Sequence, residues 1–374
     1  MTPGGGPLVT VVVPAFDAAA TLPATLASVR VQTYSRLQIL VVDDGSRDGT
    51  AAVADAAATE DPRIRVLRRA NGGVARARNA GLAEAEGELV AWIDADDLWH
   101  PEKVARQVPL FAAPNPPTLV YAGYRLIDGD DRVIPNRRPL VAIAGRSLAL
   151  QVATNFFSNV SSAMAPTALV RRLGGHDPRL RDEGMEGAED LLLQLRLAAL
   201  GPVQGVNEAL VGYRRHAGNM SRDHARSARS NLRALELLAK DAPALPGWVL
   251  RTGRARVTGY AAHCLAEGHP LAAARILGRG MRSAPIETLA MWARLLIEVA
   301  GPLRHRMCTD PAVGQTFLDA DPRTAPWGDP ILLSGRTRAR LDDVDAGRGA
   351  QDRPASSVIR SITREAPTIT KEFR

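Results

Sequence analysis

The sequence predicts an α/β fold with a mostly parallel, doubly wound sheet, followed by a C-terminal helical appendage. In roughly the first third of the chain, short apolar segments alternate with segments of helical periodicity, which is typical of parallel strands joined by helices. Acid-rich or glycine-rich turns follow several of the apolar segments. Such turns would lie at the carboxyl ends of the strands, the edge where open α/β sheets bind ligands. After residue 225 the pattern becomes helical throughout.

The individual elements follow from this pattern. Apolar and β-branched residues predict strands at residues 8–14, 37–42, 64–67, 89–93 and 120–127. Helical spacing or an Ala-rich composition predicts helices at residues 18–33, 48–58, 74–85, 168–173 and 189–200. Residues 135–162 are expected to be a loop with a short helix.

The chain has 374 residues, enough for one large domain or two ordinary ones. We expect a catalytic domain at residues 1–225, a helical appendage at 226–305 and an extended or disordered tail at 306–374. The two cysteines, Cys264 and Cys308, give neither a disulfide framework nor a zinc spacing, so a reducing, cytoplasmic location is expected. The first residues do not resemble a signal peptide, and no run of 18 apolar residues predicts a membrane span.

The net charge of +7 is unevenly distributed. Residues 226–374 carry 23 Lys and Arg against 15 Asp and Glu, a balance of +8. These charges are dispersed and are not interleaved with aromatic residues, so we expect no nucleic-acid partner. The segment 286–299, which contains Trp292, predicts an amphipathic helix. Domain packing is favoured for it over membrane anchoring, although weak peripheral contact with an anionic inner membrane face is a possible second role.

The most informative feature is the cluster Asp94-Ala95-Asp96-Asp97, directly after the predicted strand 89–93. Three neighbouring carboxylates repel one another unless a positive charge compensates them. Mg²⁺ and Mn²⁺ prefer such hard oxygen ligands, and these ions usually also hold substrate phosphates. The alternative is an acidic turn in which Asp97 caps the next helix.

Three other polar or glycine-rich segments could contribute residues to a functional site. Pro14-Ala15-Phe16-Asp17 follows the first predicted strand, and Asp43-Asp44-Gly45-Ser46 follows the second. The latter is also common turn chemistry. The segment 71–81 places two glycines before a helix that carries Arg76 and Arg78, so backbone N–H groups and positive charge could bind a phosphate. It is neither a Walker A loop nor a dinucleotide fingerprint.

Taken in order, four segments resemble the family 2 glycosyltransferases of the GT-A fold: V-V-V-P-A-F-D, V-V-D-D-G-S-R-D-G-T, N-G-G-V-A-R-A-R-N-A-G and W-I-D-A-D-D. Two later segments, G-A-E-D-L-L-L-Q-L-R and Y-R-R-H-A-G-N-M-S, resemble the family's Glu-Asp motif and the segment that closes its domain. The resemblance covers roughly residues 8–225. The appendage resembles no family known to us.

The resemblance implies a donor site with specific roles. It assigns nucleobase binding to Asp44, the walls of the same pocket to Pro14 and Phe16, the ribose to Asp94 and the metal to Asp96. Arg76 and Arg78 match positions that face the nucleotide. His216 could approach the diphosphate or the metal, or could be a surface histidine.

The resemblance also implies a reaction. The Glu-Asp motif supplies the general base, which here is Asp190, although alone the pair Glu189-Asp190 reads as a helix first turn favoured by the macrodipole. We expect an inverting transfer, dependent on Mn²⁺ or Mg²⁺, from a nucleoside diphosphate sugar of uridine type. The acceptor is an unknown glycan, lipid-linked or small molecule, in glycan, cell-surface polysaccharide or glycolipid biosynthesis.

Two other functions compete with this reading. A nucleotidyltransferase also places acids at strand ends, but it usually has a Gly-rich loop with a Lys where this chain has Pro14-Ala15-Phe16-Asp17. An inactive GT-A scaffold that binds a polyanion through its basic C-terminal part would have lost the acids, yet Asp44, Asp94, Asp96 and Asp190 are all present.

Overall fold

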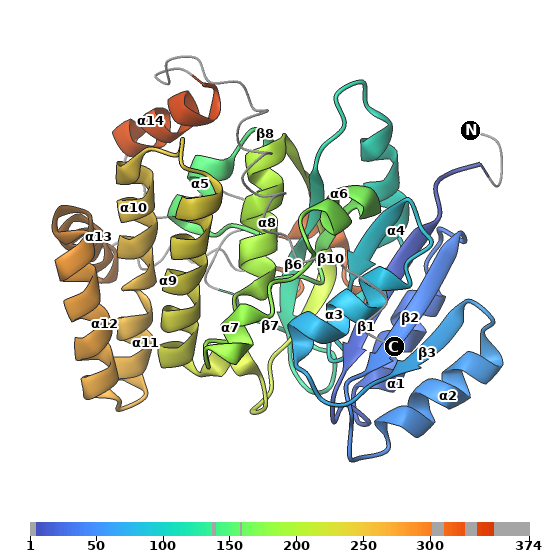
Figure 1. The fold of residues 1–374 in the computed structure, drawn as a ribbon. Coiled ribbons are helices and arrows are strands. Elements are labelled where there is room, and N and C mark those ends of the chain that lie inside the picture. The colour runs from blue at the N-terminus through green and yellow to red at the C-terminus, as the bar shows by residue number, and fades with distance from the viewer. Residues whose placement is uncertain (1–4, 137–139, 158, 301–309, 326–334, 348–374) are drawn as a thin grey trace.

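The computed structural model describes residues 5–136, 140–157, 159–300, 310–325 and 335–347. Within these residues, one sheet runs through the centre of the molecule in the order β3-β2-β1-β4-β9-β6-β10-β5, with β7 paired to β6 and β8 paired to β10 (Figure 1). Its strands are β1 (Val9–Ala15), β2 (Leu37–Asp43), β3 (Ile64–Arg68), β4 (Leu89–Trp92), β5 (Leu98–Trp99), β6 (Leu119–Ile127), β7 (Val133–Ile134), β8 (Ala144–Gly145), β9 (Ala163–Pro166) and β10 (Val203–Arg214).

The two halves of the sheet differ in strand direction. β1, β2, β3 and β4 are parallel, as predicted. The other half is mixed, because β9 runs antiparallel to both β4 and β6, while β6 and β10 are parallel. The α/β class is therefore confirmed, but "mostly parallel" describes only the N-terminal half. β9 has four residues and β10 is interrupted by Gln204, Asn207 and Glu208, so neither gave a clear strand pattern in the sequence.

Helices cover both faces of the sheet. α1 and α2 pack with one face of β1, β2 and β4, while α3, α6 and α8 pack with the opposite face. The helices up to this point are α1 (Leu22–Arg30), α2 (Thr50–Glu60), α3 (Val74–Ala83), α4 (Lys103–Gln107), α5 (Leu148–Thr154), α6 (Thr167–Arg172), α7 (Arg179–Asp182) and α8 (Glu189–Leu200), with a 3₁₀ segment at Val108–Ala112.

The C-terminal helices form a layer beside α5 and α8 (Figure 1). They are α9 (His224–Asp241), α10 (Gly247–Val257), α11 (Tyr260–Ala266), α12 (Pro270–Ser283), α13 (Pro285–Ala300) and α14 (Gly335–Asp345), with 3₁₀ turns at Met220–Arg222, Phe317–Asp319 and Pro322–Thr324. One apolar cluster joins α9 to α12 and α14 with α5 and α8. The predicted helical appendage therefore exists, but it shares a core with the preceding domain.

The described parts of residues 306–374 differ from the predicted tail. Residues 310–325 pack against β6, β7 and β10, with Phe317 buried. Helix α14 packs on α5 through the buried Leu341, and the Asp345 carboxylate accepts hydrogen bonds from the first backbone N–H groups of α5. A few separate residues hold these segments in place. The sequence therefore shows no apolar periodicity from which their packing could have been predicted. The rest of the predicted tail, including residues 348–374, lies outside the described residues.

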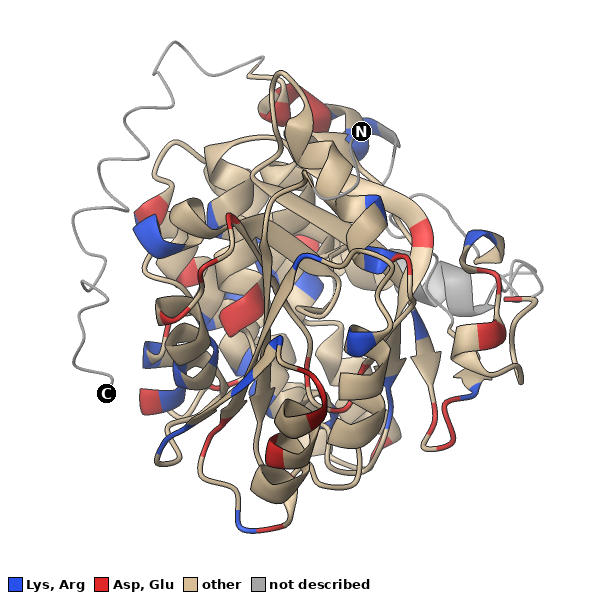
Figure 2. Ribbon diagram, turned by 90° about the vertical axis from the view of Figure 1, so that its right-hand side faces the viewer, with Lys and Arg blue, Asp and Glu red and all other residues tan. Residues whose placement is uncertain are grey.

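The charge distribution on the surface and the packing of the C-terminal helices concern the expected contact with a membrane. Figure 2 shows basic and acidic residues interspersed on the face that it presents. The indole Nε1 of Trp292 donates a hydrogen bond to Thr258 at 2.9 Å, and its ring packs on the core beneath α10, which agrees with the packing role expected for this helix. Among the described residues, no helix combines the length and the apolarity needed to cross a membrane. Peripheral membrane contact stays a prediction.

Candidate functional site

A cavity of about 630 Å³ opens at the carboxyl ends of β1, β2 and β4. Parallel strands end at the same edge of a sheet, so the turns that follow them converge there. The sequence-predicted residues that line the cavity are Pro14, Phe16, Asp17, Asp44, Arg78, Asp94, Asp96, Asp190 and His216. Segments that lie far apart in the sequence are thus brought together around one space.

Asp44 is buried at the end of the cavity that β1 and β2 form. Its carboxylate accepts hydrogen bonds from the backbone N–H groups of Gly72 and Gly73, the latter at 2.7 Å, and Arg69 lies 3.2 Å away. Burial raises the pKa of Asp44, although these N–H groups and the arginine oppose that effect. Asp44 therefore fixes the loop that precedes α3 while facing the cavity.

The glycine at position 73 is required by this geometry. Its φ is +89°, and a Cβ there would lie 2.2 Å from the Nη1 of Arg181 and 2.7 Å from a carboxylate oxygen of Glu186. Only glycine adopts this backbone without strain and leaves room for both side chains. The loop can therefore approach both Asp44 and Arg181 closely.

Phe16 lies at the mouth of the cavity, with 45% of its surface exposed. The next residue, Asp17, has a positive φ of 48°, and its carboxylate accepts a hydrogen bond from the Arg47 N–H at 2.8 Å. This contact ties the turn after β1 to the turn after β2. Pro14 and Phe16 are thereby held on the cavity wall next to Asp44.

Asp94 and Arg78 form an ion pair inside the cavity. The buried Arg78 guanidinium donates a hydrogen bond to Asp94 Oδ1 at 2.6 Å, and the Asp94 N–H donates to the Ser161 hydroxyl at 3.1 Å. Arg78 is also close enough to Asp190 to affect its pKa. Arg78 therefore places one positive charge between two of the predicted acids.

Asp96 and His216 are brought together although 120 positions separate them in the sequence. His216 Nε2 lies 2.8 Å from Asp96 Oδ2, and the side-chain amide of Asn219 donates to the same oxygen at 3.2 Å. His216 is held in place because its backbone N–H donates to Asn219 Oδ1 at 2.5 Å. Asn219 was not singled out in the sequence, although it lies within the segment that resembles the end of the family domain.

Asp97 is fully buried and faces away from the cavity, so it supports the site from behind. Its carboxylate accepts hydrogen bonds from the Ser161 hydroxyl at 2.5 Å and from the Arg214 N–H at 3.0 Å. The Arg214 guanidinium in turn donates to the Asp96 carbonyl at 2.7 Å. This network joins the turn after β4 to the end of β10, and so sets the position of Asp96 relative to His216.

The acids of the predicted Glu-Asp motif begin helix α8, where the helix dipole favours negative charge. Glu189 is buried, both of its oxygens accept from the Gly187 N–H, and burial raises its pKa to about 7. Asp190 lines the cavity, and its Oδ1 accepts from the Leu191 N–H at 2.7 Å. Burial raises the pKa of Asp190, while the charge of Arg78 opposes that effect.

Arg76 is the predicted site residue that the structure does not bring into the cavity. Its guanidinium donates two hydrogen bonds of 2.9 Å to the Asp182 carboxylate and one to the Gly72 carbonyl. A role toward the nucleotide stays a prediction for Arg76. Arg181 lines the cavity instead and donates to Asn71 at 2.6 Å.

Other lining residues carried no signal in the sequence. They are neutral polar or aromatic side chains from the irregular middle of the chain and from the C-terminal helices: Asn155, Asn159, Ser227, Asn231 and Tyr260. No motif marks them, because their position depends on how β9, α8, α9 and α11 pack.

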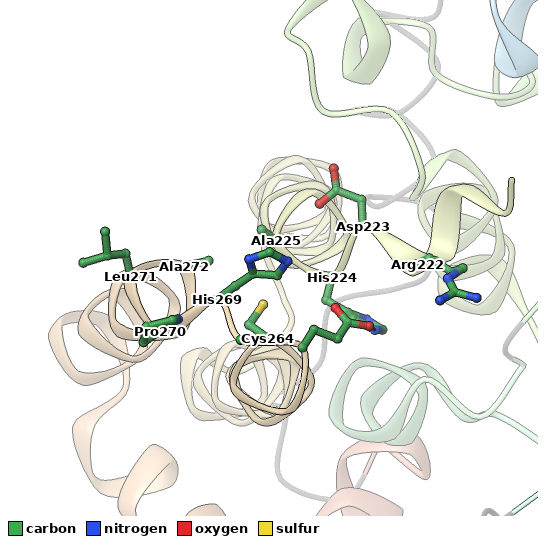
Figure 3. A pocket seen from close by; sticks show the side chains of 11 residues that line it. Arg222, Asp223, His224, Ala225, Cys264, His269, Pro270, Leu271 and Ala272 are labelled. Atoms are coloured by element: carbon green, nitrogen blue, oxygen red, sulfur yellow. Dashed lines mark ion pairs between the residues drawn. The ribbon is translucent and has the colours of Figure 1, made fainter. Parts of the chain in front are cut away.

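A second cavity, of about 520 Å³, lies where α9, α11 and α12 meet. Figure 3 shows Asp223, His224, Cys264 and His269 around it. His224 Nε2 lies 3.2 Å from Glu267, and its ring stacks on His263 at 4.6 Å between centroids. Over the described ranges, no group of three or more His, Cys, Asp or Glu side chains is arranged to hold a metal ion, either here or at Asp96.

Known proteins are similar in sequence to the N-terminal part of the chain. Residues 10–172 match the profile of the family described as Glycosyl transferase family 2. An uncharacterized glycosyltransferase of Rickettsia typhi is 27% identical over 213 residues, which is 56% of this chain and 64% of the relative. Another, of Nostoc, is 36% identical over 127 residues, or 34% of this chain and 39% of the relative. The chain spans 19% to 65% of the length of the first five curated relatives.

Solved structures share the fold. A mannosyltransferase from Pyrobaculum calidifontis, determined with GDP-Man and Mn²⁺, has a TM-score of 0.54 at 22% identity over 81% of this chain and 83% of its own. S. aureus TarS 1–349, determined with UDP-GlcNAc, has a TM-score of 0.53 at 17% identity over 78% of this chain and 87% of its own. At these identities the likeness concerns the fold, which confirms the predicted GT-A architecture.

Proposed function

Because residues 10–172 match the model of glycosyl transferase family 2, we propose that this chain transfers a sugar from a nucleoside diphosphate sugar to an acceptor hydroxyl, with inversion at the anomeric carbon. The observation that carries the proposal is one cavity lined by Asp44, Asp94, Asp96 and Asp190. These four acids correspond to the separate roles that such a transfer needs. The pathway we propose is glycan, cell-surface polysaccharide or glycolipid synthesis.

The donor lies along the strand ends. The nucleobase is at Asp44, between the wall formed by Pro14 and Phe16 and the loop at Gly73. The ribose lies at Asp94, whose charge Arg78 compensates at 2.6 Å. The diphosphate then falls near Asp96 and His216. UDP is our first choice of nucleotide, and GDP is the second because the similar mannosyltransferase was determined with GDP-Man.

The chemistry of the side chains fits a divalent ion at Asp96. A carboxylate and an imidazole nitrogen lie 2.8 Å apart with an amide beside them, and Mn²⁺ accepts such a mixed oxygen and nitrogen set. Few protein ligands suffice where substrate phosphates and waters complete the coordination. When bound, Mn²⁺ or Mg²⁺ would stabilise the charge that develops on the leaving diphosphate. Asp96 and His216 would hold it, and Asn219 would orient both through its hydrogen bonds to them.

The proposed transfer is a single displacement. The acceptor hydroxyl gives its proton to the Asp190 carboxylate as its oxygen bonds to the anomeric carbon of the donor. The bond from that carbon to the diphosphate oxygen breaks, and the nucleoside diphosphate leaves with the electron pair. The raised pKa of Asp190 makes it a stronger base than an ordinary exposed aspartate. The positive charge of Arg78 favours the ionised form of Asp190, the form that accepts the proton.

Asp190→Asn tests the proposal. We expect the variant to bind UDP or GDP in the presence of Mn²⁺ as the wild type does, and to lose about 10² to 10⁴-fold in turnover, the range typical of a lost general base. The matched control is Asp55→Asn, since Asp55 is an exposed acid on α2 that pairs with Arg68 outside the cavity. Calorimetry measures binding, and release of nucleoside diphosphate measures turnover. An Asp190→Asn variant with the turnover of the control would contradict the assignment, and no affinity for any nucleoside diphosphate would contradict the function.

A further inference from the structure

The cavity continues beyond Asp190, into the layer of C-terminal helices. There α9 and the first residue of α11 contribute Ser227, Asn231 and Tyr260 to its wall. These helices lie on the other side of α8 from β1, β2 and β3, which carry the nucleotide end (Figure 1). All three side chains bear a hydroxyl or an amide, and none of the three is charged.

Helix α9 is oriented so that its uncharged side chains, and not its arginines, line the cavity. Ser227 and Asn231 are four residues apart and share one face of the helix, which is the face that lines the cavity. The helix is rich in arginine, but its arginines are directed elsewhere. Arg233 pairs with Glu183 at 2.7 Å, and Arg229 is exposed outside the cavity. A helix with abundant positive charge thus presents only neutral groups to the site.

The buried side-chain amide of Asn159 indicates that this end of the cavity binds a ligand. Asn159 is 5% exposed and lines the cavity, and its Oδ1 accepts from the Ser162 N–H at 2.9 Å. Its Nδ2 donates to no group among the described residues. Buried donors in folded proteins nearly always have a partner. Gln194, one helical turn after Asp190, lies next to Asn159 and donates to its carbonyl at 3.3 Å.

We infer that this end of the cavity binds the acceptor, and that the acceptor is a neutral, polyhydroxylated sugar. This inference rests on the proposed function and adds the acceptor class to it. Sugar hydroxyls both donate and accept hydrogen bonds, as the hydroxyls of Ser227 and Tyr260 do, and they can accept from the unpaired Asn159 Nδ2. A phosphate or carboxylate acceptor would instead be expected to lie against arginine. The arginines that line the cavity, Arg78 and Arg181, are engaged by Asp94 and by Asn71 and Glu186, respectively.

The first experiment compares acceptor classes with the full-length enzyme and Mn²⁺. UDP-glucose, UDP-GlcNAc and GDP-mannose are each offered as donor with three kinds of probe: neutral methyl glycosides, a methyl glucuronide, and a short-chain polyprenyl phosphate in detergent. We expect a neutral glycoside to raise the release of nucleoside diphosphate above the hydrolysis seen without acceptor. Stimulation by the anionic probes alone, or by none of the panel, would overturn the inference.

The second experiment assigns the effect to the C-terminal helices. Ser227→Ala and Tyr260→Phe each remove one hydroxyl, and we expect each to raise the KM for the glycoside about 3- to 10-fold, the effect of one lost neutral hydrogen bond. The KM for the donor should not change. The matched controls are Ser283→Ala and Tyr34→Phe, which remove the same groups outside the cavity.

The outcomes separate this inference from the function on which it rests. Unchanged acceptor KM values in Ser227→Ala and Tyr260→Phe, with measurable donor turnover, would overturn the acceptor site alone. The absence of both donor binding and donor turnover in the wild type would overturn the proposed function as well.

Discussion

The segment at residues 310–325 is held to the sheet by a buried ion pair whose removal should be costly. Arg125 on β6 donates two hydrogen bonds to the Asp310 carboxylate, at 2.8 and 3.1 Å. The two side chains are 1% and 6% exposed, respectively. The same guanidinium also donates to the Asp321 carbonyl and to the Thr324 hydroxyl. Asp310→Ala would leave that guanidinium buried without its counter-charge.

The expected loss follows from this burial. Removing one partner of a buried ion pair typically costs about 3–5 kcal/mol, because the remaining charge is neither hydrated nor neutralised. The free energy of unfolding of Asp310→Ala should fall by about that amount. The double variant Arg125→Met/Asp310→Leu should lose much less, since no unpaired charge remains in it. Urea denaturation followed by tryptophan fluorescence measures both.

The control is an exposed ion pair of the same kind. Arg68 and Asp55 have side chains that are 55% and 50% exposed, so Asp55→Ala should change the free energy of unfolding by less than about 1 kcal/mol. If Asp310→Ala lowers the free energy of unfolding no more than Asp55→Ala does, the segment 310–325 does not depend on the Arg125–Asp310 pair and the reasoning is refuted. Hydrogen exchange at β6 and β7 would show whether the loss is local undocking or global.

Three further predictions follow. Mn²⁺ should increase the affinity for UDP in the wild type, and Asp96→Asn should reduce that increase by about tenfold or more, the typical effect of weakening a metal site. If calorimetry finds the same increase in the variant and the wild type, Asp96 does not bind the metal. Burial raises the pKa of Asp345 from 3.8 to about 6, so folding favours its protonated form. The stability of the wild type should therefore fall relative to that of Asp345→Asn as the pH rises from about 4 to above 6. Melting temperatures of the two proteins that stay parallel across this pH range would contradict the prediction. Removal of residues 348–374 should leave the melting temperature unchanged, whereas removal of 335–374 should lower it, because Leu341 and Asp345 lose their contacts with α5.

The part of the site that sequence could predict is local in the chain. Asp44, Asp94 and Asp96 each follow directly after an apolar strand, so strand pattern and acid are visible in one short segment. Parallel strands then place these turns at one edge of the sheet. The direct contact of Asp96 with His216 spans 120 positions, and the resemblance to the family supplied that residue.

The rest depends on contacts that no local pattern encodes. Arg125 and Asp310 are separated by 185 positions, and neither residue is unusual in its own segment. Asn159 and Asn231 line the cavity only because β9, α8 and α9 pack beside it. A polar residue in a loop or on a helix is normally exposed, so its burial against a cavity follows from tertiary packing alone.

Some of the basic residues of the C-terminal part form ion pairs within the described fold. Several of its arginines pair with acids inside the described fold, as Arg251 does with Glu287 at 2.7 Å and Arg233 does with Glu183. The second of these pairs connects α9 to the segment just before α8, the helix that carries Asp190. Arg233 thus fixes α9 against that segment, in an orientation in which Ser227 and Asn231 line the cavity.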